Sequence, residues 1–130
     1  MKRIAIVTGA SRGIGREIAK MLAKKDIQVI ANYNNSEKKA IELQEELKKE
    51  NINIDIFKAD ISKREDARKL VEYTLEKYKK IDILVNNAGI SEYKMFTEET
   101  DSDWNRVINN NLYSAFVMCQ EVIPNMIHNK

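Results

Sequence analysis

Hydrophobic residues gather in four short runs along the chain, and longer segments of helical period separate these runs. The runs cover residues 3–8, 28–33, 53–58 and 81–86. The first and last are almost continuously apolar, which is typical of strands buried on both faces of a sheet. Between the runs, apolar side chains recur every three or four residues, so each segment is predicted to be a helix that buries one stripe.

Polar residues mark the starts of two of these helices. Ser36 stands just before residues 37–39 of the second helical segment. Ser62 stands three residues before Glu65, which is the spacing of a capping box, where two side chains satisfy the first backbone N–H groups of a helix. We therefore expect the second and third helices to begin at these serines.

A long final helix follows the fourth run. Thr100 or Asp101 opens it, and Pro124 is expected to interrupt it near its end, because proline removes a backbone hydrogen bond. One face of this helix carries most of its apolar side chains and is predicted to pack on the core. That face comprises Trp104, Ile108, Leu112, Ala115, Cys119 and Val122.

Strand and helix alternate four times, which describes βαβ units with right-handed crossovers. The pattern predicts a Rossmann-like, three-layer α/β/α fold, in which helices cover both faces of a four-stranded parallel sheet of order 3-2-1-4. Ligands of such sheets bind at the carboxyl ends of the strands, in the crevice between the first and fourth strands. We treat residues 1–130 as a single domain.

Composition excludes several classes of partner. Lys and Arg number 22 against 20 Asp and Glu, and a net charge of +2 gives no signature for nucleic acid or an anionic membrane. No apolar run approaches the roughly 18 residues of a membrane span. The only cysteine, Cys119, and the only histidine, His128, cannot form a disulfide or a recognised metal site, so we expect no metal and a reducing, cytoplasmic location.

A glycine-rich turn follows the first strand. Residues 8–15 read Thr-Gly-Ala-Ser-Arg-Gly-Ile-Gly, with glycines at positions 9, 13 and 15. At a strand-to-helix junction, missing side chains let backbone N–H groups approach a pyrophosphate, and the helix N-terminus adds partial positive charge. The alternative is that the glycines only permit a tight turn and close helix packing. We favour binding because of the placement of this loop.

The residues around the loop indicate which dinucleotide would bind. Domains that are specific for NAD place a carboxylate after the second strand, where it binds the ribose 2′-OH. This chain has Asn34 and Asn35 there, and Arg12 supplies a cation within the loop. A 2′-phosphate would fit beside Arg12 and these amides, so the sequence favours NADP(H) over NAD(H).

Other strand ends carry polar groups whose role the sequence leaves open. Asp60 either starts the following helix or accepts a hydrogen bond from an adenine amino group. Asn86 and Asn87 most simply satisfy turn backbone, although Gly89 indicates close approach by another group. Asn111 interrupts the apolar face of the final helix, either as a buried, satisfied amide or as an anchor of an active-site network.

Taken together, the glycine loop, Asp60-Ile61, residues 86–89 and Trp104 followed by Asn111-Leu112 resemble the short-chain dehydrogenase/reductase family in order and spacing. Within it, the chain is most similar to the 3-oxoacyl-[acyl-carrier-protein] reductases of fatty acid biosynthesis, which reduce a ketone with NADPH. The resemblance implies that Asn111 is the catalytic asparagine, which orders a water in a proton relay. It implies a cofactor site made of Gly9, Ser11, Arg12, Gly13, Ile14, Gly15, Asn34, Asp60, Ile61, Asn87, Ala88 and Gly89.

The family's remaining catalytic residues have no counterpart here. They are a serine on the fifth strand and a Tyr-x-x-x-Lys on the next helix. The only tyrosine followed by lysine at that spacing is Tyr73, with Lys77, which we interpret as an exposed pair on the third helix. Family chains run roughly twice this length, in keeping with two βαβαβ halves. We therefore expect an NADP(H)-binding half-domain that stops before the fifth strand and is inactive alone.

Two other functions are weighed against this expectation. The fourth strand would be an apolar sheet edge, so the chain could be an assembly fragment, and we expect a homodimer in which a second copy covers that edge or the Trp104 helix. Acyl-carrier protein would be a partner only of the full-length parent. A flavodoxin-like flavin binder is a weaker rival, because the glycine-rich turn suits a dinucleotide pyrophosphate.

Overall fold

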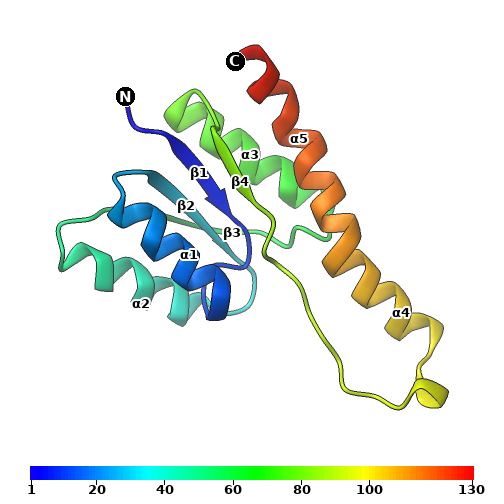
Figure 1. Cartoon of the computed structure of the whole chain (residues 1–130). Coiled ribbons are helices and arrows are strands. Elements are labelled where there is room, and N and C mark those ends of the chain that lie inside the picture. The colour runs from blue at the N-terminus through cyan, green and yellow to red at the C-terminus, as the bar shows by residue number, and fades with distance from the viewer.

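A computed structural model describes residues 1–130. Its sheet contains β1 (Ile4–Val7), β2 (Gln28–Tyr33), β3 (Asp55–Lys58) and β4 (Ile83–Val85). All three pairings are parallel, and the strands follow the order β3-β2-β1-β4 (Figure 1). The predicted topology is confirmed, and β1 lies at the centre with the reversal of winding between β1 and β4.

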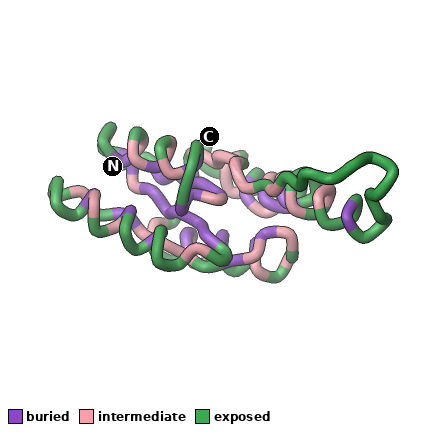
Figure 2. The backbone as a smooth tube through the Cα atoms, turned by 90° about the horizontal axis from the view of Figure 1, so that it is seen from below, coloured by how far each residue is buried: buried purple, intermediate pink, exposed green.

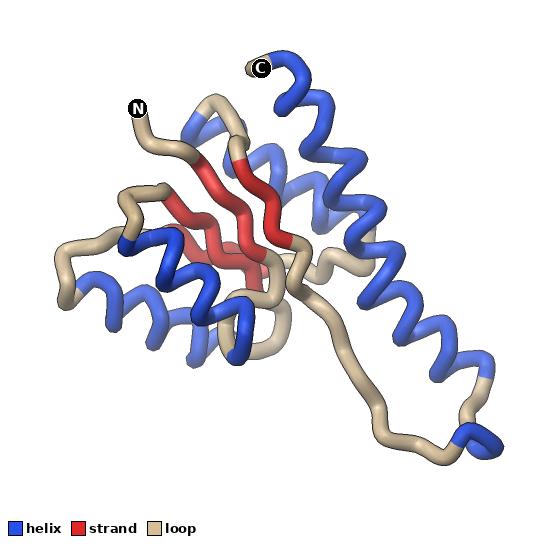
Figure 3. Tube along the Cα trace, viewed as in Figure 1, coloured by secondary structure: helices blue, strands red, loops and turns tan.

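Helices cover both faces of the sheet. One face carries α1 (Gly13–Lys24) and α2 (Glu37–Lys48), and the other carries α3 (Arg64–Tyr78) and α5 (Ser114–His128), as Figure 3 shows. The predicted three-layer arrangement is therefore present. Each helix turns one stripe of side chains toward the strands, as its apolar period indicates.

The core consists of two apolar clusters, one on each face of the sheet. Successive strand residues point to opposite faces. Ile4 and Ile6 of β1 therefore join the cluster beneath α3 and α5, whereas Val7 joins the one beneath α1 and α2. The central strands are buried on both sides, which explains their nearly continuous apolar sequence.

The predicted capping box at Ser62 is wrong. Helix α3 begins at Arg64, and the Ser62 hydroxyl donates to Asp60 Oδ1 at 2.6 Å instead. Asp66 supplies the other bond of this turn, since its carboxylate accepts from the backbone N–H of Asp60 at 2.9 Å. Ser36 precedes α2 as expected, but its side chain makes no capping bond.

The final helix is longer and less regular than predicted. It comprises α4 (Asp101–Ile108), a π-helical segment (Asn109–Tyr113) and α5, and Thr100 caps its start in a reciprocal box with Asp103. The predicted apolar face is wrong for Trp104 and Leu112, both of which are exposed. The π-helical segment inserts one extra residue per turn and rotates the buried face. In α5 that face comprises Ser114, Val117, Met118 and Val122.

Pro124 does not interrupt the final helix, contrary to expectation. α5 continues through Pro124 to His128. Beside it, Val122 is fully buried, and the Asn125 side chain accepts a hydrogen bond from the Ile81 backbone N–H at 3.0 Å. These contacts to the body of the domain hold the last turns in place despite the lost backbone bond.

The segment between β4 and α5 extends away from the sheet. Residues 91–100 are exposed, and they include a short 3₁₀ helix, η1 (Phe96–Glu98) (Figure 2). Because α4 lies beyond the sheet edge, its apolar side chains have no layer to pack on. None of the helices combines the length and apolar character that a membrane span requires.

The burial of a side chain predicts how much its removal lowers the free energy of unfolding. Leu43 of α2 is fully buried, whereas Ile41 of the same helix is 39% exposed. We expect Leu43→Ala to lower the free energy of unfolding by about 2–5 kcal/mol, because it removes buried apolar atoms and leaves a cavity. Ile41→Ala should change it by less than ~1 kcal/mol. Urea unfolding followed by circular dichroism checks both, and equal losses would contradict the packing described.

Candidate functional site

A cleft of about 350 Å³ opens at the carboxyl ends of the four strands. It is lined by the turn after β1, the end of β2, and the loops after β3 and β4. Of the cofactor-binding residues predicted from the sequence, only Ile14 and Gly15 lie outside its lining. The structure thus brings together Gly9, Ser11, Arg12, Gly13, Asn34, Asp60, Ile61, Asn87, Ala88 and Gly89.

The turn after β1 leaves a row of backbone donors without partners. The N–H groups of residues 11–15 donate to no acceptor in the protein. The first N–H groups of a helix lack intrahelical acceptors, and they carry partial positive charge. The two preceding N–H groups are occupied, because Gly9 donates to Asn32 Oδ1 at 3.2 Å and Ala10 donates to the Asn32 carbonyl at 2.8 Å. The row is therefore a set of unpaired donors with which an anion could form hydrogen bonds.

Close packing requires two of the loop glycines. Gly9 has φ +61, and a Cβ there would lie 2.8 Å from Ala88 Cα. A Cβ at Gly15 would overlap the Asn87 amide and the Gly9 carbonyl oxygen. The packing role that was weighed against binding is thus real at these two positions. Gly13 has φ +63 but no atom near its missing Cβ, so its conformation alone favours glycine.

Asn87 and Thr8 join the loop after β4 to the glycine turn. The buried Thr8 hydroxyl accepts from the backbone N–H groups of Asn87 and Ala88, each at 3.0 Å. The Asn87 amide donates to the carbonyl oxygens of Thr8 at 3.1 Å and of Gly9 at 3.0 Å. Asn87 therefore satisfies turn backbone, as the simpler alternative predicted, while its backbone also borders the cleft.

Charge in the cleft is sparse and unevenly distributed. Arg12 is the only basic residue of the lining, it is exposed, and it makes no hydrogen bond or ion pair with the protein. Asp60 is the only acidic residue of the lining, and its Oδ1 is held by the hydroxyl and backbone N–H of Ser62. Asn34 and Asn35 directly follow β2 and line the cleft on that side. Arg12 therefore remains free to meet an anion.

Asn111 is exposed, so the first of its two alternatives, a buried and satisfied amide on the apolar face, is wrong. It lies in the π-helical segment, and its side chain pairs with the backbone N–H and carbonyl of one residue, Ile90, in the loop after β4. Asn111 Oδ1 accepts from the Ile90 backbone N–H at 2.6 Å, and Nδ2 donates to the Ile90 carbonyl at 2.8 Å. The neighbouring Asn110 lines the cleft instead. Asn111 thus holds the loop that borders the cleft.

Tyr73 and Lys77 belong to a cluster remote from the cleft. Both donate to Asp55 Oδ2, at 2.8 and 2.9 Å, and Tyr78 donates to the same oxygen at 3.0 Å. Burial and the Asp55 carboxylate raise the pKa of Tyr78 to about 12. Asp55 begins β3, at the end of the strand opposite the cleft. The interpretation of Tyr73 and Lys77 as an exposed pair is therefore incomplete, because Asp55 binds both side chains. The pair lies at the opposite end of the sheet from the cleft.

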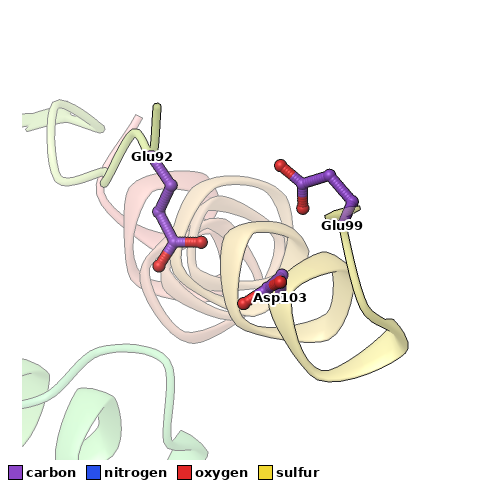
Figure 4. A group of neighbouring side chains, drawn as sticks. All are labelled: Glu92, Glu99 and Asp103. Atoms are coloured by element: carbon purple, nitrogen blue, oxygen red, sulfur yellow. The ribbon is translucent and has the colours of Figure 1, made fainter. Parts of the chain in front are cut away.

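Three carboxylates approach one another on the projecting segment. Oxygen atoms of Glu92, Glu99 and Asp103 lie within 4.8 Å (Figure 4). Lys94 donates to Asp103 at 2.7 Å, and Arg106 contacts both Asp103 and Glu92. The hydrogen bond from Lys94 holds the pKa of Asp103 well below its usual range. Two cations of the protein therefore already pair with Asp103 and Glu92, which leaves Glu99 as the one carboxylate of the three without an ion pair.

The fold and the cleft define a doubly wound α/β protein with unpaired backbone N–H groups at the start of its first helix. The comparisons with known proteins agree: the family model for short chain dehydrogenase matches residues 3–130. The chain belongs to the short-chain dehydrogenase/reductase family.

Individual relatives support this assignment. The 3-oxoacyl-[acyl-carrier-protein] reductase FabG of Staphylococcus epidermidis is 35% identical over 130 residues, which are all of this chain and 53% of that protein. A hydroxynaphthalene reductase-like protein of Metarhizium guizhouense is 39% identical over 118 residues, 91% of this chain and 44% of its own length. A solved double mutant of a Serratia marcescens short-chain dehydrogenase/reductase has TM-score 0.90 and 31% identity, covering 95% of this chain and 51% of its own. The chain spans about half the length of these relatives.

The pairing of Asn111 with Ile90 generates a prediction. Asn111→Ala should speed amide hydrogen exchange at Ile90 by about tenfold, because one hydrogen bond, ~1 kcal/mol or more, is lost. Asn109→Ala serves as the control, since the exposed Asn109 side chain makes no hydrogen bond. Exchange at Ile90 measured by NMR distinguishes the two, and unchanged exchange in Asn111→Ala would show that the pairing does not hold the loop.

Proposed function

We propose that this chain binds NADP(H) in the cleft at the carboxyl ends of its strands. The observation that carries the proposal is the row of backbone N–H groups at residues 11–15, which have no acceptor in the protein. Unpaired donors at a helix N-terminus suit a pyrophosphate. Members of the family use a nicotinamide dinucleotide, and the donors present fit its diphosphate.

The remaining lining residues suit the other parts of a dinucleotide. Asp60 and Ile61 would flank the adenine, since both border the cleft beyond β3. Residues 87–89 would lie near the nicotinamide ribose, because they border the cleft beyond β4. A dinucleotide would thus extend along the ends of the strands, with its diphosphate at the central turn after β1.

We propose that the cleft prefers NADP(H) over NAD(H) because of Arg12. An unpaired guanidinium at the cleft provides a bidentate partner for a 2′-phosphate. The β2 end offers the amides of Asn34 and Asn35 and no carboxylate in the lining. A carboxylate at that place would instead favour the free 2′-OH of NAD(H).

We further propose that the parent reaction is NADPH-dependent reduction of a ketone to an alcohol, in the cytoplasm, as the resemblance to 3-oxoacyl-[acyl-carrier-protein] reductase FabG indicates. Asn111 would be the one catalytic residue that residues 1–130 contribute. The Tyr73–Lys77 pair lies at the wrong end of the sheet to protonate a carbonyl in the cleft. These residues therefore form a nucleotide-binding half-domain that turns over no ketone alone, and acyl-carrier protein would be a partner of the whole parent only.

Cofactor titration tests the proposal. Fluorescence titration should give saturable binding of NADPH and weaker binding of NADH. Arg12→Gln should weaken NADPH binding by about tenfold or more and leave NADH nearly unchanged, because the lost bond is charge-assisted.

Arg3→Gln is the matched control, since it removes the same charge from an exposed residue before β1, away from the cleft. It should bind both cofactors like the wild type. Absence of saturable binding of either cofactor would refute the proposed function. Equal losses for NADPH and NADH in Arg12→Gln would refute the phosphate preference alone.

A second candidate function is assembly, because the structure leaves two apolar surfaces open. One edge of β4 has no neighbouring strand. The final helix also exposes apolar side chains at Trp104, Leu112, Phe116, Ile123 and Ile127, of which the last four recur at helical spacing. We propose that a second copy of the chain covers this helix face or the β4 edge, giving a homodimer.

Light scattering tests the assembly proposal. The wild type should have twice the chain mass of 15.1 kDa at tens of micromolar. Phe116→Glu should yield the monomer if the helix face is the interface, because it buries an unpaired charge there. Ile41→Glu, on an exposed site of α2, is the control and should stay dimeric. A wild type that is still monomeric at tens of micromolar would contradict the proposal.

A further inference from the structure

Asn32 is a buried polar residue to which the sequence alone assigns no role. It is the penultimate residue of β2, only 2% exposed, and its side chain lies among backbone groups from other segments. A buried amide must find partners, because burying it unpaired is costly. Its partners connect the glycine turn to the loop after β3.

Both the oxygen and the nitrogen of the Asn32 side-chain amide have hydrogen-bond partners. Oδ1 accepts from the Gly9 backbone N–H at 3.2 Å. Nδ2 donates to the Ala59 carbonyl at 3.0 Å, and the carbonyls of Phe57 and Tyr33 lie at 3.4 and 3.3 Å. The backbone carbonyl of Asn32 accepts from Ala10 at 2.8 Å. This one residue therefore receives the first two N–H groups of the glycine turn.

This arrangement decides which N–H groups of the turn remain available. Those of Gly9 and Ala10 point to β2, and those of residues 11–15 stay without acceptors. Asn87 holds the same turn from the other side, since it donates to the Gly9 carbonyl. The backbone of Gly9 is thus held at both its N–H and its carbonyl before any ligand binds.

Resting on the proposed function, we infer that Asn32 is a positioning residue for the dinucleotide: it holds the glycine turn in the conformation that presents residues 11–15. Ligand affinity improves when a loop is already ordered in its bound conformation. The role requires one acceptor and one donor on the same side chain, which asparagine supplies. Leucine supplies neither, and ionised aspartate supplies only the acceptor.

Asn32→Asp gives a test with a built-in rescue. At pH 8 a carboxylate would face the carbonyls of Ala59 and Phe57, so NADP⁺ binding should weaken by about tenfold. Burial and these carbonyls raise the pKa of the new carboxyl. On acidification it becomes protonated and regains a donor for Ala59, so the ratio of mutant to wild-type dissociation constants should fall toward one at pH 5.5.

Asn32→Leu should bind NADP⁺ weakly at both pH values, because it cannot regain a donor. Asn53→Asp, at an exposed position before β3, is the matched control and should follow the wild type throughout. Calorimetric titration gives the dissociation constants. Expressing each variant relative to wild type at the same pH removes the titration of the cofactor's own phosphate.

A measurement without ligand completes the test. Amide exchange at Gly9, followed by NMR, should accelerate in Asn32→Leu and stay slow in Asn32→Asp, which keeps the acceptor. Wild-type affinity and Gly9 exchange in both variants would overturn the inference. If the wild type binds no NADP⁺, the proposed function fails and the inferred role fails with it, while Gly9 exchange still reports whether Asn32 holds the turn.

Discussion

The backbone of Gly9 is the point on which the site depends. Asn32 receives its N–H, Asn87 donates to its carbonyl, and Ala88 packs against its Cα. These contacts come from the ends of β2 and β4, the two neighbours of β1 in the sheet. Because the Gly9 backbone is held from both sides, the turn keeps a conformation in which the N–H groups of residues 11–15 have no acceptor in the protein.

Strand order explains why these partners meet at one residue, Gly9. The winding reverses between β1 and β4, so the loops after both strands approach each other at the carboxyl edge of the sheet. The two buried clusters pack against the strands from both faces. The cleft is therefore a consequence of topology, whereas the anion preference that we propose for it rests on local backbone donors and Arg12.

Sequence alone predicts the sheet order and most of the cleft lining, because apolar runs and glycine spacing are local patterns with few structural solutions. It does not reveal Asn32, since that residue lies within a strand and its partners are distant in sequence. The exposure of Asn111 and Trp104 was missed because the π-helical segment and the projection of α4 beyond the sheet shift which residues face the core. The capping box predicted at Ser62 was also wrong, because the spacing to Glu65 did not reveal the hydrogen bonds that the carboxylates of Asp60 and Asp66 make in this turn.

We propose that the unpaired N–H groups of residues 11–15 bind the diphosphate of a dinucleotide. An NMR titration of the ¹⁵N-labelled chain with NADP⁺ is the sharpest test of it. We expect saturable shifts concentrated at residues 11–15, with the Gly9 and Ala10 amides remaining protected by Asn32. Saturable binding that leaves the amides of residues 11–15 unmoved, or no binding, would contradict it.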